Sequence, residues 1–519
     1  MMATVFTNGS IVTMEPSLPM ADWLVVDGGR IAGVGLGDPP GAAAEYDLAG
    51  RCLLPGFQDA HVHPPIGGLA MNRCDIHEVD PADYRYTIAA YAASHPDEEW
   101  ILGGGWAMHD FPGGIALASI LDSVVPDRPA LLHGSEGHGA WANTRALQRA
   151  GIDAATADPE DGRIERFEDG SPNGTLQEGA VALVERVIPA TTPPELQAGI
   201  VSGQRYLIAL GITAWQDAWV TEEVQEAYLA ADHAGELLAT VIGALWWDRE
   251  RGVEQIDDLI ERSKHGSPRF LPRAVKLMVD GVCENGTAAM LAPYDGRDDH
   301  GIQFIDRDIL LEAVPRIMAA GLQPHFHAIG DRAIRDALDA VEAGDHASAA
   351  AVRPHIAHIQ VIDPRDVPRF GRLGVAANAQ AFWACYDGCM VDLTAPRLGD
   401  RRTALQYPFR SLIDQGARFA CGSDWSVSTA DPFAQMAVAT TRREHAQAEP
   451  FVPEQAITRI EALRGFTAGA AWVNHRERES GSLVAGKVAD MVVASENPLV
   501  ADDLASVNAE GAFISGSAI

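Results

Sequence analysis

The sequence is poor in cysteine, and the cysteines it has are scattered. Six cysteines occur among 519 residues, and none of them forms a Cys-x-x-Cys pair. A small domain held together by disulfides needs a dense and regular set of cysteines, so the sequence excludes that class. We expect reduced and mostly buried thiols in a cytoplasmic protein.

Long apolar runs and basic residues are also scarce. The sequence has no run of about 18 apolar residues, the length that a membrane-spanning helix needs, and its first residues lack the basic and apolar regions of a secretory signal. Lys and Arg number 39 against 72 Asp and Glu, which gives a formal net charge of −33. Nucleic acids and anionic membranes are bound by clusters of Lys and Arg. We therefore expect a soluble protein that binds neither.

Strand-like and helix-like segments alternate through the middle of the chain. Helical patterns cover 194–210, 309–320 and 333–343, among others. Eight β-then-α repeats predict a closed parallel barrel of the (β/α)8 or TIM type, an α/β fold. The expected strands are Cys52–His63, Ile212–Asp217, Thr240–Trp247, Ala274–Asp280, Gln323–Ala328, His355–Gln360, Val375–Gln380 and Arg418–Asp424.

Two regions lie outside this repeat. Both ends of the chain are rich in short strands and turns, including a strand-like Gly481–Leu483, so residues 1–55 and 476–519 are expected to form one small β-sandwich domain. The barrel would then occupy residues 56–475. Between its first two strands lies an unusually long stretch, and we predict a folded insertion over residues 66–195. Loops at that end of a barrel build active sites.

Two histidines close the first expected strand. His61 and His63 are two residues apart, and alternate side chains of a strand point to the same face. Two neutral imidazoles on one face make half of a metal site. The alternative is a pair of histidines held by hydrogen bonds in the core or a loop.

A lysine occupies the middle of the fourth expected strand. Lys276 has apolar neighbours, and burial would lower its pKa and favour the neutral amine. A neutral amine can take up carbon dioxide to give a carbamate, which could bridge two metal ions. Alternatively, the side chain lies on the outer face of the barrel and pairs with a carboxylate of a helix.

Histidines and an aspartate recur at the ends of later strands. The fifth strand has His325 and His327, the sixth has His355 and His358, and the eighth ends at Asp424. The C-terminal ends of barrel strands meet at one mouth, so these groups are expected to lie together with those of strands one and four. The spacing leaves open which histidine of each pair takes part.

This set resembles the amidohydrolase superfamily in its binuclear subtype with a carboxylated lysine. More narrowly it resembles the long YtcJ-like branch, amidohydrolase family 3, which includes N-substituted formamide deformylase. The stretches that carry the resemblance are Leu54–Pro64, Leu131–Leu147, Asp161–Glu178, Val275–Gly281, His325–Ala333, Arg353–Gln360, Gly422–Val427 and Gly481–Val492.

The resemblance implies a role for each residue. His61 and His63 would bind one divalent ion, and His327 and His358 a second. Lys276, as a carbamate, would bridge the two ions. Zinc is expected, with manganese and iron as alternatives. Asp424 would be both a metal ligand and the general base.

The implied reaction is hydrolysis of a carbon–nitrogen bond in an amide, whether N-acyl, N-formyl or cyclic. A divalent metal lowers the pKa of bound water from about 15.7 to about 7. Asp424 would accept the proton of that water and deliver it to the leaving nitrogen. His138, in the insertion, would steady the developing oxyanion, although a structural hydrogen bond in its loop is an equal alternative.

Two other functions compete with this one. A mononuclear deaminase of the same fold has a proton-shuttling Glu after the histidine of strand five and does not use the lysine of strand four, whereas here Asp331 follows and Lys276 is present. A non-catalytic binding or scaffold protein would have lost ligands, and every expected position is filled. We expect a small-molecule substrate and a homodimer.

Aromatic residues near the strand ends suggest an apolar or aromatic substituent on the substrate. Packing in the core is the commoner role of such residues, and we expect it for most of them. The residues concerned are Trp106, Trp141, Trp215, Trp246, Trp247, Phe382, Trp383 and Trp425.

Overall fold

The computed structural model describes residues 3–77 and 79–519, and its centre is an eight-stranded parallel sheet. The strands follow one another around the sheet in chain order, which confirms the predicted barrel. From the first to the last, they are β8 (Phe57–Val62), β15 (Ile212–Val220), β16 (Thr240–Trp246), β17 (Phe270–Met278), β18 (Gln323–Ala328), β19 (His355–His358), β20 (Ala376–Ala379) and β21 (Arg418–Cys421).

The barrel closes between β8 and β21 at its C-terminal mouth. The backbone N–H of Asp424 donates to the carbonyl oxygen of His61 at 2.8 Å, and the N–H of His63 donates to the carbonyl of Trp425 at 2.7 Å. These bonds are made by residues at or just beyond the strand ends. Closure therefore brings the segment around Asp424 beside His61 and His63.

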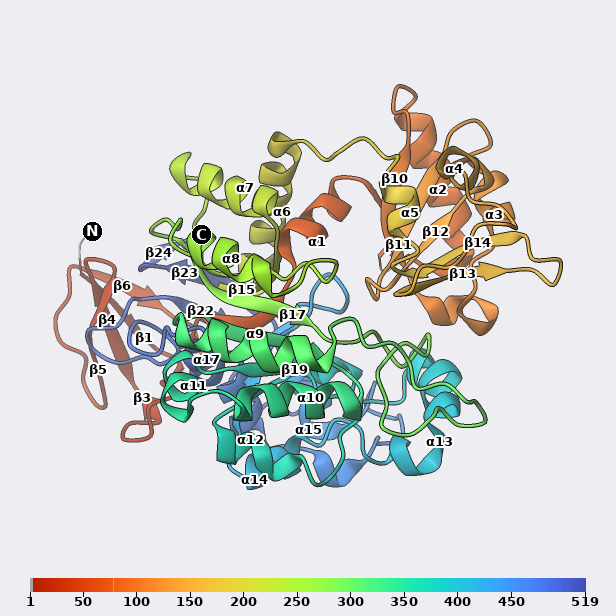
Figure 1. Cartoon of the computed structure of the whole chain (residues 1–519). Helices are drawn as coiled ribbons and strands as arrows, with labels where there is room; N and C mark the ends of the chain where they lie inside the picture. The colour runs from red at the N-terminus through yellow and green to blue at the C-terminus, as the bar shows by residue number, and fades with distance from the viewer. Residues whose placement is uncertain (1–2, 78) are drawn as a thin grey trace.

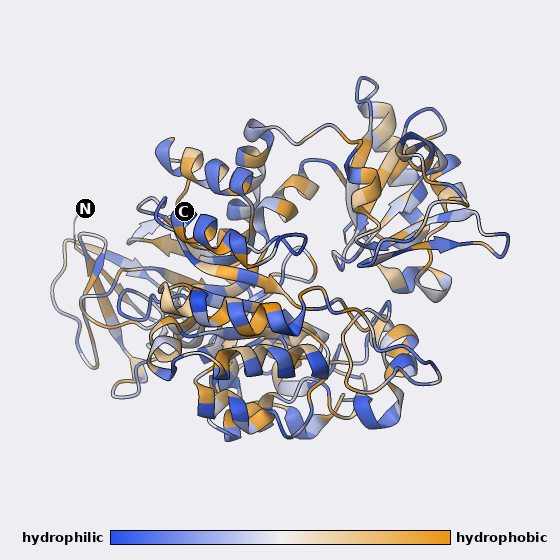
Figure 2. Ribbon diagram, viewed as in Figure 1, coloured by the Kyte–Doolittle hydropathy of each residue, from blue (hydrophilic) through white to orange (hydrophobic). Residues whose placement is uncertain are grey.

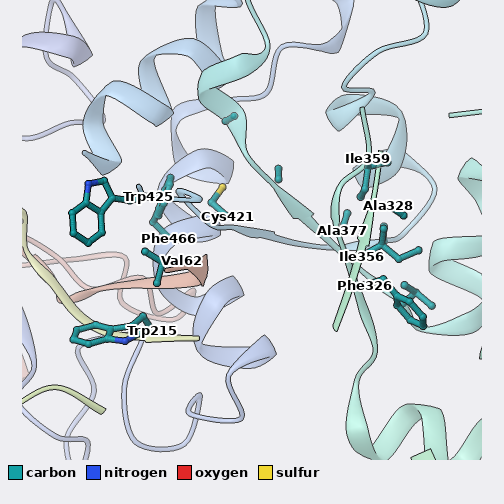
Figure 3. Packing of buried hydrophobic residues seen from close by; sticks show 14 of the residues in the cluster. Val62, Trp215, Phe326, Ala328, Ile356, Ile359, Ala377, Cys421, Trp425 and Phe466 are labelled. Atoms are coloured by element: carbon teal, nitrogen blue, oxygen red, sulfur yellow. The ribbon is translucent and has the colours of Figure 1, made fainter. Parts of the chain in front are cut away.

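Helices surround the barrel and cover the apolar outer side chains of its strands (Figure 1). Figure 2 shows these helices with one hydrophobic and one hydrophilic face, the pattern of helices packed on a sheet. In Figure 3, Phe326, Ile356 and Ala377 of three adjacent strands lie together in this layer. The helices are α6 (Pro193–Ala209), α7 (Glu222–His233), α8 (Ile256–Arg262), α9 (Arg307–Ala319), α10 (Asp331–Glu342), α11 (His346–Val352), α12 (Val367–Leu373), α14 (Phe409–Asp414), α15 (Pro432–Thr441), α16 (Arg459–Arg464) and α17 (Ala470–Val473). Helix α13 (Ala395–Thr403) packs through Leu398 on a separate, smaller cluster.

Strands from both ends of the chain pair in one six-stranded sheet, in the order β24-β23-β22-β7-β2-β3. A four-stranded sheet, β5-β4-β1-β6, packs against it around Phe6, Leu53 and Met491. The bounds are β1 (Thr4–Thr7), β2 (Ser10–Val12), β3 (Met20–Ala21), β4 (Trp23–Asp27), β5 (Arg30–Gly35), β6 (Ala44–Asp47), β7 (Cys52–Pro55), β22 (Met491–Ala494), β23 (Ala509–Ile514) and β24 (Ser517–Ala518).

Two strand predictions at these ends are wrong. The expected strand Cys52–His63 is two strands, because β7 joins the terminal sheet while β8 starts the barrel. Gly56 separates them, and a Cβ there would lie 2.4 Å from Thr213 Oγ1. Gly481–Leu483 is not a strand, although Leu483 donates its N–H to the carbonyl of Thr13. The limits of the terminal domain itself stay our proposal.

The insertion forms a separate lobe with a six-stranded sheet of its own, in the order β13-β14-β12-β11-β10-β9 (orange in Figure 1). Helix α1 (Pro64–Met71) precedes this lobe and packs on α6, where a Cβ at Gly68 would lie 1.8 Å from the carbonyl oxygen of Gly199. The lobe contains β9 (Cys74–Asp75), α2 (Tyr84–Ser94), β10 (Ile101–Trp106), α3 (Ala118–Asp122), β11 (Ala130–Gly134), β12 (Gly139–Ala142), α4 (Thr144–Ala150), β13 (Gly162–Arg166), β14 (Pro172–Glu178) and α5 (Ala182–Glu185).

Across residues 3–77 and 79–519, the helices are all too short or too polar to cross a membrane.

Candidate metal centre

The first strand and the segment after the last strand meet at a carboxylate. Nε2 of His63 lies 2.9 Å from Oδ1 of Asp424, and Nε2 of His61 lies 3.2 Å from the same oxygen. All three side chains are buried. The strand periodicity therefore places both imidazoles on one face, as the sequence predicts.

A buried aspartate below these residues fixes the local backbone. Oδ1 of Asp59 accepts the N–H of His61 at 2.9 Å and that of Ser423 at 3.0 Å. Asp59 thus joins the first and last strands directly beneath the site. Burial raises the pKa of its carboxyl to about 7.

Lys276 lies inside the barrel. Its side chain is buried, and Nζ lies 3.4 Å from Nε2 of His61. Burial lowers the pKa of the amine to about 7. An outward position with a helix carboxylate as partner, the alternative considered above, does not occur.

His327 and His358 complete the group from the next two strands. Their ring centroids are 4.4 Å apart, and the ring of His358 lies 4.8 Å from that of His61. Nδ1 of His358 is 3.9 Å from Oδ2 of Asp424. The six side chains expected from the sequence therefore lie at one mouth of the barrel, and all of them line one cavity.

The other histidine of each pair lies deeper and serves as a support. Nε2 of His325 is 2.8 Å from Nδ1 of His61, and Nε2 of His355 is 2.8 Å from Oε1 of Gln216. Among the residues that the structure describes, neither His325 nor His355 lines the cavity. The contact from His325 orients His61 so that its Nε2 faces Asp424 and Lys276.

The electrostatics of the group favour metal binding. Burial lowers the pKa of His61 to about 3 and the pKa values of His327 and His358 well below the usual range, so the rings are neutral. Burial alone would raise the pKa of Asp424, but His61, His63 and His358 together hold it well below its usual value. Neutral imidazoles and an ionised carboxylate are the forms that bind a divalent cation.

Two site residues have a strained backbone. His358 has φ +78° and Asp424 has φ +58°, and residues other than glycine rarely adopt this left-handed region. Such strain costs about 1–3 kcal/mol for each residue and concentrates at functional sites. The surrounding structure thus holds both side chains in place at an energetic cost.

The donor atoms fit a metal ion. Ligand atoms of His61, His358 and Asp424 all lie within 4.8 Å of one another. Within residues 3–77 and 79–519, Nδ1 of His63 and both ring nitrogens of His358 are buried without a hydrogen-bond partner. Buried polar atoms are almost always paired, so an ion bound through one nitrogen of each ring would supply a partner that these buried rings need.

Comparison with known proteins identifies the family. The model of the amidohydrolase family matches residues 44–516. The chain belongs to the amidohydrolase family. Membership supports metal-dependent hydrolysis and a divalent metal ion.

Three curated relatives match over nearly the whole chain. Protein LONG AFTER FAR-RED 3 of Arabidopsis thaliana is 31% identical over 95% of this chain and 87% of its own length. The putative amidohydrolase YtcJ of Bacillus subtilis is 27% identical over 96% of each chain. N-substituted formamide deformylase of Arthrobacter pascens is 29% identical over 95% of this chain and 93% of its own. The resemblance inferred from the sequence is thereby confirmed.

The fold agrees with this assignment. An uncharacterized metal-dependent hydrolase of Pyrococcus furiosus has a TM-score of 0.73 and 23% identity, with 96% of this chain and 100% of that chain covered.

The cavity of this amidohydrolase has a volume of about 720 Å³, and aromatic side chains form part of its lining. Trp219 and Trp246 stack with centroids 4.2 Å apart, and Trp383 stacks on His358 at 5.6 Å. Together with Phe382 they line the cavity. The aromatic prediction is therefore correct in part, and Trp219 was missed. Trp106, Trp141, Trp215 and Trp247 are fully buried in the core, and Trp425 stacks on Tyr206.

His138 reaches this amidohydrolase's cavity from the insertion. Its Nδ1 lies 3.0 Å from Oε2 of Glu178, and its ring centroid lies 5.4 Å from that of His327. Burial alone would lower the pKa of His138, but the charge and hydrogen bond of Glu178 raise it above the usual value. Glu178 has φ +51° and also accepts from Thr287 Oγ1 at 2.7 Å. Sequence reasoning missed this carboxylate, although it ends a stretch that resembles the family.

Asp280 is a second residue that sequence reasoning missed. It is fully buried and accepts backbone N–H groups from Ala289, Ile329 and Gly330 at 2.9–3.0 Å. Its Oδ1 also lies 3.8 Å from Nε2 of His327. Asp280 thus joins the loops after β17 and β18 and supports His327 from outside the cavity.

Proposed function

We propose that this protein hydrolyses a carbon–nitrogen bond in an amide of the N-formyl, N-acyl or cyclic kind. The observation that carries the proposal is the convergence of neutral imidazoles, a buried amine and an ionised carboxylate on one point of the cavity. A relative named N-substituted formamide deformylase, matched over nearly its whole length, supports an amide substrate.

In this proposal the six side chains share two divalent ions. His61, His63 and Asp424 would hold one ion and His327 and His358 the other, with zinc favoured and manganese and iron as alternatives. Lys276, as a carbamate, would supply a ligand to both ions. The neutral amine forms a new N–C bond to carbon dioxide and releases one proton to solvent. The burial that lowers the pKa of this amine to about 7 supports the step.

The ions supply Lewis acidity, which polarises a carbonyl group and acidifies water. Asp424 is ionised and rigidly held, so it is suited to accept the proton of the attacking water. As the tetrahedral centre collapses, the same carboxyl returns that proton to the leaving nitrogen. An N-formyl or N-acyl amide gives a free acid and a free amine, and a cyclic amide gives one ring-opened product that carries both groups.

His138 is proposed to stabilise the negative charge that develops on the carbonyl oxygen. Glu178 receives the Nδ1–H, so the second ring nitrogen of the protonated ring is left for the substrate. A preorganised donor in a buried site is worth more than one exposed to water. The stacked pair Trp219 and Trp246 would receive an apolar or aromatic substituent.

The role of His138 gives a prediction with a pH signature. We expect His138→Ala to lower kcat by about 100- to 1000-fold, the usual cost of losing an oxyanion donor. Glu178→Gln should cost less and shift the alkaline limb of the kcat–pH profile to lower pH, because Glu178 raises the pKa of His138. The control is Glu185→Gln, a half-exposed carboxylate that lines the same cavity. An unmoved alkaline limb in Glu178→Gln would contradict the charged role of His138.

Metal counting and a substrate panel test the function as a whole. We expect about two ions per chain at this centre in the purified protein and loss of turnover on chelation, restored by zinc. The panel contains N-formyl, N-acyl and cyclic amides together with aminated heterocycles. A content of about one ion with release of ammonia from a heterocycle would instead identify a mononuclear deaminase. Full metal loading without turnover of any amide would favour a binding protein.

A further inference from the structure

A second group of metal-ligand side chains lies on the cavity wall, apart from the six residues discussed so far. It consists of His109, Glu136 and Cys389, and we call it the wall cluster. His109 belongs to the short helix η2 (Met108–Asp110), and Glu136 follows β11, so both come from the insertion. Cys389 precedes η6 (Met390–Thr394) in the connection between β20 and α13 of the barrel. The cluster therefore joins the lobe to the barrel.

The distances in the wall cluster suit a single ion. Nδ1 of His109 lies 3.2 Å from Sγ of Cys389, and that sulfur lies 4.0 Å from Oε1 of Glu136. Zinc binds sulfur at about 2.3 Å and nitrogen or oxygen at about 2.0–2.2 Å, which separates tetrahedral ligands by about 3.5 Å. The two observed distances lie on either side of that value. Small side-chain rotations would equalise them.

The backbone already holds two of these ligands in place. Oε1 of Glu136 accepts the N–H of Met108 at 2.7 Å. A Cβ at position 388 would lie 2.7 Å from Cδ2 of His109, so the imidazole packs directly on Gly388. The ring is 37% exposed, which leaves it open to the cavity.

A positive charge would stabilise the wall cluster. Oε2 of Glu136 is buried without a hydrogen-bond partner in residues 3–77 and 79–519. Burial, followed by the charges of Glu136, Asp387 and Glu284, raises the pKa of the Cys389 thiol. A cation at this point would neutralise the carboxylates and stabilise the thiolate.

We propose that His109, Glu136 and Cys389 bind a third divalent ion of the zinc class, with its fourth position open to Asp387 or water. Binding forms a metal–sulfur bond and releases the thiol proton to solvent. A hydrogen bond from the Cys389 thiol to His109 would explain their contact but not the unpartnered oxygen of Glu136. The ion would fasten the insertion to the barrel at the cavity wall.

Cobalt(II) distinguishes this ion from those of the main centre. Cobalt bound to a thiolate absorbs in the near ultraviolet by charge transfer, and none of the six residues assigned to the main centre carries sulfur. We expect metal-free protein titrated with cobalt chloride to develop this band and to saturate it at one thiolate-bound ion per chain. Cys389→Ser should abolish the band and lower the total cobalt bound by one ion.

Three further variants complete the test. Cys385→Ser is the matched control, because this thiol lies in the same connection and donates to the carbonyl of Phe382 instead. It should keep the band, and so should Lys276→Ala, which alters only the main centre. His109→Ala should weaken cobalt binding at the band at least tenfold, and a melting curve checks that each variant is folded. A band that survives in Cys389→Ser, or no band in wild-type protein saturated with cobalt, would overturn the proposal.

Discussion

Asp424→Asn is expected to reduce kcat by about 100- to 10,000-fold, the range over which a positioned general base contributes. The amide keeps the size of the side chain and an oxygen near His61 and His63, but it cannot accept a proton. The backbone bond from residue 424 to His61, which closes the barrel, is unaffected. We therefore expect metal content and melting temperature close to those of the wild type.

Steady-state kinetics on the best substrate of the amide panel, with metal analysis of the same preparation, provide the measurement. Asp248→Asn is the control, because Asp248 lines the cavity but accepts a hydrogen bond from the N–H of Glu250. It should leave kcat nearly unchanged. Near-normal turnover in Asp424→Asn, with metal retained, would refute the assignment of the base.

The order of strands and the face of the first two histidines were predictable because they depend only on local periodicity. The choice within the pair on strand five has a simple geometric answer. His325 and His327 share a face, but each residue of a strand advances about 3.3 Å, so His327 lies about 7 Å closer to the mouth. The deeper ring contacts His61 instead. On strand five, depth along the barrel rather than residue type distinguishes the candidate ligand His327 from His325, which contacts His61.

The choice between the two histidines of strand six could be made only from the structure. His355 and His358 are three residues apart, which in a regular strand would place them on opposite faces. The left-handed backbone at His358 breaks that alternation at the strand end and turns its ring toward the cavity. No propensity of a histidine predicts such a conformation, because the surrounding packing imposes it.

Groups assembled from distant loops were also not predicted from the sequence. Glu178 ends a strand of the insertion and contacts His138, which directly precedes the neighbouring strand, while Cys389 contacts His109 across the boundary between lobe and barrel. These contacts depend on the register of the insertion's sheet and on how the lobe rests on the barrel. Neither is encoded in a short motif. The strand ends of the barrel, by contrast, converge in every such fold, so its site could be anticipated.

Lys276→Met is expected to lower the metal content of this centre from about two ions per chain to one or fewer and to abolish turnover, because the ligand shared by both ions is lost. Methionine matches the length of lysine and is apolar, so the buried position accepts it. The protein should fold, and its stability should hold or increase, since burial of the amine is itself costly.

Rescue by small carboxylates tests whether Lys276 provides the carbamate ligand. Acetate or propionate offers the two oxygens that the carbamate would have provided, so adding either one with zinc should restore part of the metal content and of the turnover in Lys276→Ala, where the cavity is larger. The bulkier methionine should block this rescue. Lys264→Ala, an exposed lysine paired with Glu261, is the control and should behave as wild type. Full metal content in Lys276→Met, with or without carboxylate, would remove Lys276 from the metal centre and leave the other five side chains to hold both ions.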